Sequence, residues 1–452
     1  MTVDPSAYLT SDAEHLIHSL HNAAAQQQAL VWTRGEGALL YDQNDRPVLD
    51  ALSGLWNVLV GHGRRELAAA AARQMETLAY ASCYAGSSNP AAIELGERLA
   101  EITYPSINRF FFTSGGAEAN ESAFKTARYF WKTQGKPEKY KVIGRTWGYH
   151  GTTMAAMSAT GIASYWPMFE PRVPGFSHIA SPYPYRFEFQ PKPGDNRTPG
   201  QAAADLLEEE ILRQGPETVA AFIGEPVQGA GGVIVPQDDY WPRIREICDR
   251  YDVLLLADEV ITGFGRTGDW FALSRYGIEP DIISFAKGVT SGYFPLGGIG
   301  VSDRIAQAID AGPQQGLVWM HAFTYSAHPV ACAVALANLD ILQNENLLER
   351  ARELGQALQT KLQTLQSHPH VGEVRGLGYM AAVEIVADKA TKAEFPPEFQ
   401  AGSRVHQATI RRGMFTRLRG DVYNFAPCYV ASEQQLDQMV NILGESLDEV
   451  LK

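Results

Sequence analysis

Three short, uninterrupted apolar segments constrain the fold of this chain more than any other feature of its sequence. They lie at residues 219–224 (VAAFIG), 253–257 (VLLLA) and 282–285 (IISF), and an amphipathic stretch at 239–251 separates the first two. Strands that are apolar on both faces and alternate with helices are typical of a mainly parallel sheet covered on both sides. The sequence therefore predicts an α/β fold with strands at these three segments.

Other segments extend this pattern toward both ends of the chain. We expect a packed helix at 12–30, a hairpin at 37–52, strands at 109–113 and 141–144, a helix at 117–134, a long loop at 169–199, a long helix at 329–365, a strand-like stretch at 373–385, a loop at 388–402 and a helix after 432. Domains usually hold 50–250 residues. We predict a large domain of residues 71–330 and a small α+β domain built from residues 1–70 and 331–452.

The overall charge limits the classes of partner. The 452 residues carry a net charge of −13, whereas a general nucleic-acid binder needs a basic surface that neutralises phosphates. The first residues lack the pattern of a secretory signal, and no apolar run reaches the ~18 residues that span a bilayer. The four cysteines form no C-x-x-C pair, and no H-E-x-x-H is present, so we expect a cytoplasmic protein without a metal site.

Four segments carry residues suited to chemistry. Asp258 and Glu259 end one apolar strand, Lys287 follows another, TSGGAEAN at 113–120 joins a strand to a helix, and WGYHG lies at 147–151. Each feature also has an ordinary explanation: a loop-capping acid, a solvated lysine, a tight turn and a packed aromatic. The two acids could also hold Mg²⁺. Together they describe a phosphate cradle, a stacking aromatic, an acid and an amine at strand ends, which suits the flat phosphorylated aldehyde pyridoxal 5′-phosphate (PLP).

Longer motifs then point to a family. LLLADEVITGFGRTG at 254–268 and SFAKG at 284–288 strongly resemble the class III aminotransferases of PLP fold type I. The resemblance extends to SGLWN at 53–57, SGGAEANE at 114–121, GEPVQGAGG at 224–232, FTYSAHP at 323–329 and EVRGLGYMAAVEI at 373–385. Within the class the chain looks most like the ω-transaminases of the amine:pyruvate and β-alanine:pyruvate group. This implies a large domain with a mainly parallel seven-stranded sheet, a small domain from both termini, and a homodimer or tetramer with the active site at the interface.

The resemblance also implies roles for individual residues. Lys287 would form a Schiff base with PLP and shuttle a proton, and Asp258 would keep the pyridine nitrogen protonated. The residues implied to bind the cofactor are Gly115, Gly116, Ala117, Tyr149, Glu225, Asp258, Val260, Lys287 and Thr324. Those implied to bind substrate are Trp56, Tyr84, Tyr149, Ala230, Phe323 and Arg417, and Thr324 would act across a dimer interface.

Two positions depart from related sequences. The family often has Ser at the position of Ala117, so one phosphate contact is missing and we expect weaker retention of PLP. Related branches place a Glu at the position of Ala230, where it pairs with an arginine that is Arg417 here, or Arg419 as the alternative. Without that acid the arginine is free to bind a carboxylate or to move away. We therefore expect pyruvate as acceptor and a primary amine or ω-amino acid as donor.

Other functions use the same residues. A decarboxylating aminotransferase or an aminomutase would share Lys287 and Asp258. A PLP-fold transcriptional regulator needs a basic DNA-binding domain, for which the length and charge leave no room. A metal-dependent phosphotransferase would use Asp258 and Glu259 on Mg²⁺ and would lack the visible absorbance of a Schiff base.

Overall fold

A seven-stranded sheet forms the centre of the larger part of the molecule. The computed structural model describes residues 5–451. In spatial order the strands are β4 (Ile107–Thr113), β10 (Gly297–Ser302), β9 (Ile282–Phe285), β8 (Leu254–Asp258), β7 (Val219–Gly224), β5 (Lys141–Arg145) and β6 (Phe176–Ile179). Only β10 runs antiparallel to its neighbours β4 and β9. The mainly parallel sheet is thus confirmed, and all three apolar segments lie at its centre.

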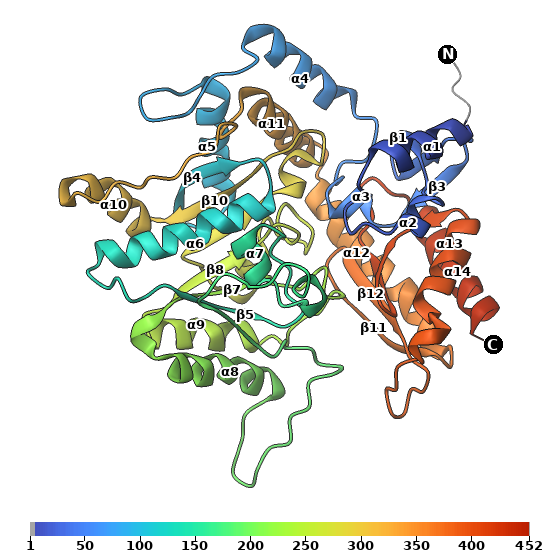
Figure 1. Cartoon of the computed structure of the whole chain (residues 1–452). Helices are drawn as coiled ribbons and strands as arrows, with labels where there is room; N and C mark the ends of the chain where they lie inside the picture. The colour runs from blue at the N-terminus through green and yellow to red at the C-terminus, as the bar shows by residue number, and fades with distance from the viewer. Residues whose placement is uncertain (1–4, 452) are drawn as a thin grey trace.

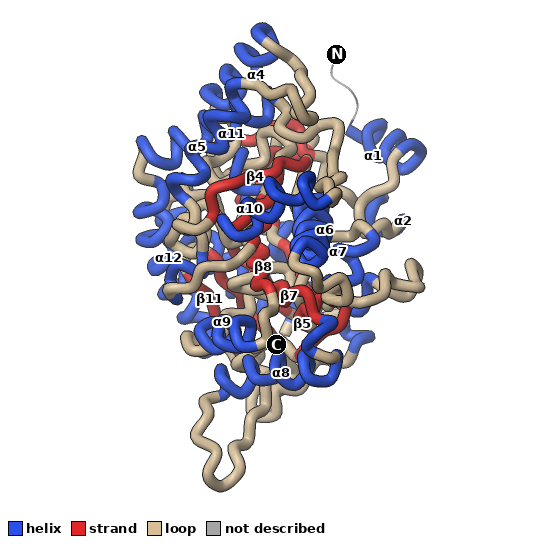
Figure 2. The backbone as a smooth tube through the Cα atoms, turned by 90° about the vertical axis from the view of Figure 1, so that its left-hand side faces the viewer, coloured by secondary structure: helices blue, strands red, loops and turns tan. Residues whose placement is uncertain are grey.

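Helices cover both faces of this sheet, as Figures 1 and 2 show. On β8, Leu254 and Leu256 pack in a cluster with residues of α6 (Gly116–Thr133) and α10 (Asp303–Ala311). Leu255, which points the opposite way, joins the cluster that contains residues of the helices on the other face. Those helices are α5 (Pro90–Ile102), α8 (Pro199–Gln214), α9 (Tyr240–Arg250) and α11 (Pro329–Asn344). Burial on both faces explains why the strands are continuously apolar.

The smaller part of the molecule combines both ends of the chain (Figure 1). One four-stranded sheet has the order β1 (Trp32–Glu36), β2 (Leu39–Asp42), β3 (Pro47–Asp50) and β13 (Met414–Phe415). A second has the order β11 (Val371–Leu377), β12 (Met380–Ile385), β15 (Val422–Phe425) and β14 (Arg417–Arg419). Because β13 pairs in parallel with β3, residues more than 360 positions apart share one sheet. The domain limits at residues 70 and 331 stay a prediction.

The remaining helices complete this arrangement. They are α1 (Pro5–His15), α2 (Ala23–Gln26), α3 (Ser53–Trp56), α4 (Arg65–Thr77), α7 (Met154–Ala159), α12 (Leu347–Gln363), α13 (Ala401–Arg411) and α14 (Glu433–Val450). No helix within residues 5–451 is long and apolar enough to cross a membrane. The four cysteines are free thiols, and only Cys83 is not buried.

Two of the expected helices are wrong in extent. The helix expected at 12–30 is interrupted, because α1 ends at His15 and α2 begins at Ala23. Its apolar residues Leu16, Ile17 and Leu20 are exposed. The helix expected at 329–365 breaks at Asn346, whose φ of 51° is left-handed and separates α11 from α12.

Six strands were missed, namely β1, β6, β10, β13, β14 and β15, and one expected strand is two strands. The stretch at 373–385 is a hairpin that turns at Gly378, where φ is +57° and a Cβ would come within 2.3 Å of the Thr267 backbone. Strand β6 lies inside the expected loop at 169–199. Strand β10 has the sequence GGIGVS, which does not indicate a strand because glycine has low strand propensity.

Candidate active site

Lys287 and Asp258 lie at the carboxyl ends of neighbouring parallel strands. Asp258 ends β8 and pairs in register with Ser284 of β9, and Lys287 begins the short 3-10 helix that follows β9. The carboxyl edge of parallel strands is where α/β folds bind ligands. Lys287 has a left-handed φ of 45°, a conformation that costs free energy in a residue other than glycine and that clusters at functional sites.

A cavity of about 380 Å³ opens at this edge. Six of the residues considered from the sequence line it: Trp56, Tyr149, Ala230, Lys287, Arg417 and Arg419. They come from both parts of the molecule, since Trp56 follows β3 and the two arginines belong to β14. A cavity of this size suits a small metabolite and cofactor.

The carboxylate of Asp258 is buried and held by two side chains that the sequence had not identified. Its Oδ2 accepts one hydrogen bond from Asn120 Nδ2 at 2.8 Å and lies 2.7 Å from His150 Nδ1. Within the described residues, its Oδ1 accepts only the backbone N–H of Val260, at 3.1 Å. One oxygen is thus fixed by α6 and the 147–151 loop, and the other has room for a further donor.

The amine of Lys287 is shifted toward its neutral form. Burial lowers its pKa to about 8, and the positive charge of Arg417 acts in the same direction, while Asp258 and Glu225 oppose the shift. Among residues 5–451, no hydrogen bond or ion pair engages its Nζ. A neutral, unengaged amine can act as a nucleophile or as a base.

The first turn of α6 offers free backbone donors. Ser114 N donates to Glu118 Oε2 at 2.8 Å, but the N–H groups of Gly115, Gly116 and Ala117 find no acceptor in the described part of the chain. A Cβ at Gly116 would lie 3.0 Å from the Val260 methyl groups, so glycine lets this turn approach the strand that ends at Asp258. Free N–H groups at the start of an 18-residue helix suit a phosphate.

Glu225 and Tyr149 join two loops beside the cavity. Glu225 Oε1 accepts the backbone N–H of Tyr149 and Oε2 accepts that of Gly229, both at 2.9 Å. Burial raises the pKa of Glu225 and also that of Tyr149. The ring of Tyr149 lies 5.9 Å from that of Tyr165, which also lines the cavity.

The second acid of the strand end faces elsewhere. Glu259 Oε1 accepts the hydroxyl of Tyr104 at 2.6 Å and the N–H of Ala272 at 2.9 Å, while Thr262 donates to Oε2. Glu259 is therefore a buried structural residue, and in the part of the chain that the structure describes the two acids share no hydrogen-bonding partner. This disfavours the alternative in which both hold Mg²⁺.

Nine of the predicted site residues do not line this cavity. Six of them, described above, are Asp258, Val260, Glu225 and the three residues at the start of α6, and the other three are Tyr84, Phe323 and Thr324. Tyr84 and Thr324 are exposed, and Phe323 packs against His321 with ring centroids 4.9 Å apart. The backbone carbonyl of Thr324 accepts the hydroxyl of Tyr80 at 2.8 Å. Their roles stay predictions, as do the roles of the residues within the cavity.

The sequence missed several apolar residues of the cavity wall. These are Leu20, Leu55, Ile162, Met168, Phe169 and Ile261. Of these, Leu20, Met168 and Phe169 are more than half exposed. No motif marks them, because any apolar residue can form a cavity wall.

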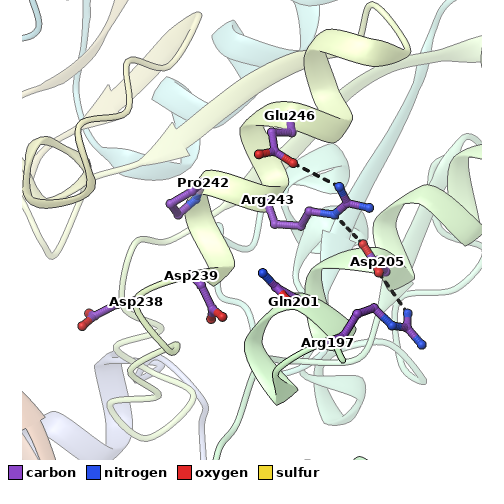
Figure 3. Close-up of a pocket in the computed structure, with 8 residues that line it drawn as sticks. All are labelled: Arg197, Gln201, Asp205, Asp238, Asp239, Pro242, Arg243 and Glu246. Carbon is purple, nitrogen blue, oxygen red and sulfur yellow. Dashed lines mark hydrogen bonds and ion pairs between the residues drawn. The ribbon is translucent and has the colours of Figure 1, made fainter. Parts of the chain in front are cut away.

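A second cavity, of about 560 Å³, lies between the N-terminal ends of α8 and α9 (Figure 3). Asp205 stands between two arginines there, accepting Arg197 Nη1 at 2.9 Å and Arg243 Nε at 2.7 Å. These charges are already paired, and none of the predicted site residues lines this cavity. Lys287 and Arg417, which have no ion-pair partner among residues 5–451, line the first cavity.

The fold and the site define a PLP-dependent enzyme of fold type I, and comparisons with known proteins agree. A family model described as aminotransferase class-III matches residues 21–447. The chain is 43% identical to a putrescine–pyruvate aminotransferase of Pseudomonas aeruginosa, covering 94% of this chain and 91% of the relative. It is 39% identical to a diaminobutyrate–2-oxoglutarate transaminase of Halomonas elongata, covering 91% and 88%.

Solved structures give the same result. An (S)-enantioselective ω-transaminase from Thermomicrobium roseum superposes with a TM-score of 0.95 at 48% identity and full coverage of both chains. The ω-transaminase from Pseudomonas jessenii in complex with PMP has a TM-score of 0.93 at 39% identity, covering 98% and 97%. The chain belongs to the class III aminotransferases. It is a transaminase whose cofactor is PLP, as the sequence predicts.

Proposed function

We propose that this chain is an ω-transaminase that moves the amino group of a primary amine or ω-amino acid to pyruvate, giving alanine. The observation that carries the proposal is that Lys287 and Arg417 line the same cavity. Among residues 5–451, no carboxylate lies within 4.0 Å of Arg417, and Ala230 supplies none from the opposite loop. A free guanidinium beside a reactive amine suits an oxo acid such as pyruvate, whose carboxylate can take a bidentate contact.

Two side chains would act on protons at the reaction centre. Bound PLP withdraws electrons from the substrate carbon that loses its proton. Lys287, whose pKa is lowered to about 8, would take the proton from that carbon and return it to the cofactor side. Asp258 Oδ1 would accept a hydrogen bond from the protonated pyridine nitrogen, while Asn120 and His150 hold Oδ2 in place.

Other residues would hold the cofactor. The N–H groups of Gly115, Gly116 and Ala117 would bind the phosphate, and Val260 and Tyr149 would flank the ring. Glu225 would keep Tyr149 in place through its hydrogen bond to the backbone of that residue. The free backbone donors at α6 and the open position at Asp258 Oδ1 support this assignment.

A homodimer would complete the site. Exposed aromatic residues gather near Thr324, since the Tyr80 and Tyr325 rings lie 6.3 Å apart and the Tyr80 hydroxyl donates to the Thr324 carbonyl. Exposed aromatic surface of this kind favours a subunit interface. In this proposal Thr324, Phe323 and Tyr84 of each subunit reach the cavity of the other. We also propose a cytoplasmic location, which four free cysteines support.

An amine-donor panel with pyruvate as acceptor tests the proposed function. We expect alanine to form with several primary amines or ω-amino acids and no carbon dioxide to be released. Carbon dioxide from a 2,2-disubstituted amino acid would favour a decarboxylating aminotransferase. Isomerisation of an amino compound without any acceptor would favour an aminomutase.

A further inference from the structure

Arg419 is a second cation at the substrate cavity. It ends β14, two residues after Arg417, and both line the cavity that contains Lys287. Residues i and i+2 of a strand point to the same face and lie ~6–7 Å apart. Arg419 also borders an open cleft of about 840 Å³ on its other side, so it forms part of the wall between the two spaces.

Arg419 has no counter-ion of its own. Its guanidinium carbon lies 4.3 Å above the ring of Trp147, and its buried Nε has no hydrogen-bond partner. The nearby carboxylate of Glu384 is already engaged by Arg186 at 2.6 Å and by Arg375 at 2.7 Å. In the described part of the chain, no carboxylate lies within 4.0 Å of Arg419.

The neighbouring Asp421 does not neutralise Arg419 either. Its Oδ1 accepts the backbone N–H of Gly402 at 2.8 Å, and burial raises its pKa. Burial also lowers the pKa of Arg419, which is the expected result for a cation held away from water without an acid. An arginine stays charged in a protein, so an anion that enters the cavity meets a desolvated guanidinium.

The two arginines differ in exposure and in their contacts. Arg417 is exposed, and its charge contributes to lowering the pKa of Lys287. Arg419 is mostly buried and stacked on Trp147, and it is not among the groups that shift Lys287. Both arginines line the cavity, and of the two only Arg417 acts on the charge of Lys287. We therefore assign the carboxylate of pyruvate to Arg417, near the reacting amine, and a more distant part of the cavity to Arg419.

We propose that Arg419 binds the far carboxylate of the amino donor, so that the preferred donors are ω-amino acids rather than uncharged monoamines or diamines. The inference rests on the proposed function and names the donor class within it. A carboxylate would gain charge-assisted hydrogen bonds from a guanidinium that is already desolvated and stacked. The second ammonium of a diamine would instead meet two positive guanidinium groups in a confined space.

The experiment measures kcat/KM with pyruvate as acceptor for donors matched in length. The donors are ω-amino acids of three to five carbons, the alkylamines of the same lengths, and the corresponding diamines. The readout is the ratio of kcat/KM for each ω-amino acid to that for its alkylamine. We expect a ratio of about ten or more in the wild type, and a 10–100-fold fall of that ratio in Arg419→Met.

Two variants serve as controls. Arg419→Lys keeps the charge without the planar fork and should retain part of the preference. Arg404→Met removes another ring-stacked arginine, 4.4 Å above Phe399 on α13 and outside the cavity, and should leave the ratio as in the wild type. Because the readout is a ratio within one variant, partial loss of folded protein cancels.

The possible outcomes distinguish failure of the Arg419 assignment from failure of the proposed function. An unchanged ratio in Arg419→Met, or wild-type preference for diamines or alkylamines, would overturn the assignment of Arg419 alone. Failure of pyruvate to accept an amino group from any donor, including exchange with L-alanine, would overturn the proposed function and this inference with it.

Discussion

The proposed cofactor end of the site, around Asp258, and its proposed substrate end, around Arg417 and Arg419, are built differently. Around Asp258, the side chains of Asn120 and His150 and a backbone N–H converge on one buried carboxylate. No acid in the described chain forms an ion pair with Arg417 or Arg419. The hydrogen bonds at the first end hold Asp258 in position before a cofactor binds. The two arginines at the other end have no acidic partner and are therefore available to bind the carboxylate of a substrate. The following variants probe each end in turn.

The largest effect belongs to the cofactor end. Lys287→Met removes the amine that would move the proton, and we expect alanine formation to fall by ~10⁴-fold. Lys139 offers a matched control, because burial also lowers its pKa to about 8 but it donates to backbone carbonyls away from the cavity. The folded fraction of Lys139→Met should keep its activity. Comparable losses in the two variants would contradict the role of Lys287.

Asp258→Asn keeps the shape of this end but removes its charge. We expect kcat to fall by ~10²–10³-fold, because the pyridine nitrogen would lose its carboxylate partner. Asp281 is a second buried carboxylate, at the opposite end of β9, that accepts Leu255 N at 2.8 Å. Asp281→Asn should lower the melting temperature while kcat of the folded enzyme persists. A kcat for Asp258→Asn near that of the wild type would refute the assignment.

The substrate end is tested by Arg417→Ala. We expect the KM for pyruvate to rise by ~10–100-fold, because a charge-assisted bidentate contact is lost. The KM for an uncharged aldehyde acceptor should change far less. Equal changes for both acceptors would show that Arg417 does not bind the carboxylate.

The pH dependence of cofactor capture tests the lowered pKa of Lys287. Only the neutral amine attacks an aldehyde, so the capture rate of the apoenzyme should rise with pH and level off above about pH 8. At pH 7 it should be ~10-fold slower than on the plateau. A rate still rising toward pH 10.5, the ordinary pKa of lysine, would show that the site does not shift the pKa of this group.

Ala117→Ser should give the smallest effect. A hydroxyl in the first turn of α6 would add one hydrogen bond to the phosphate, so PLP should bind ~3–10-fold more tightly. The space is limited, because a Cβ at Gly151 would lie 2.6 Å from Cβ of Ala117. Titration of the apoenzyme with PLP measures the affinity, and unchanged or weaker binding in the variant would contradict the prediction.

The central sheet was predictable because its strands are apolar on both faces and its helices have one apolar side. Strand β10 was not, because its glycines carry no side-chain pattern, although its position between β9 and β4 completes the sheet. The segment around Leu16, Ile17 and Leu20 was wrongly predicted as a packed helix, because it does carry an apolar pattern. Its apolar spacing resembles a packed helix, but these side chains are exposed in the single chain.

The groups proposed to react, Lys287 and Asp258, could be located from the sequence because they lie in long motifs at strand ends. Asn120 and His150 lie inside two of the quoted motifs, yet spacing alone could not show that both converge on Asp258, since that depends on how α6 meets the loop before α7. Sequence reasoning left the choice between Arg417 and Arg419 open. The structure places both at the cavity and separates them by exposure and by the stacking of Arg419 on Trp147.

The transfer of one nitrogen atom in two separate stages tests the central claim most directly. The holoenzyme is treated with a ¹⁵N-labelled ω-amino acid, freed of donor by rapid gel filtration, and then mixed with unlabelled pyruvate. The account predicts up to one labelled alanine per active site, formed only in the second stage and abolished in Lys287→Met. Absence of labelled alanine from donor-treated wild-type enzyme would contradict it.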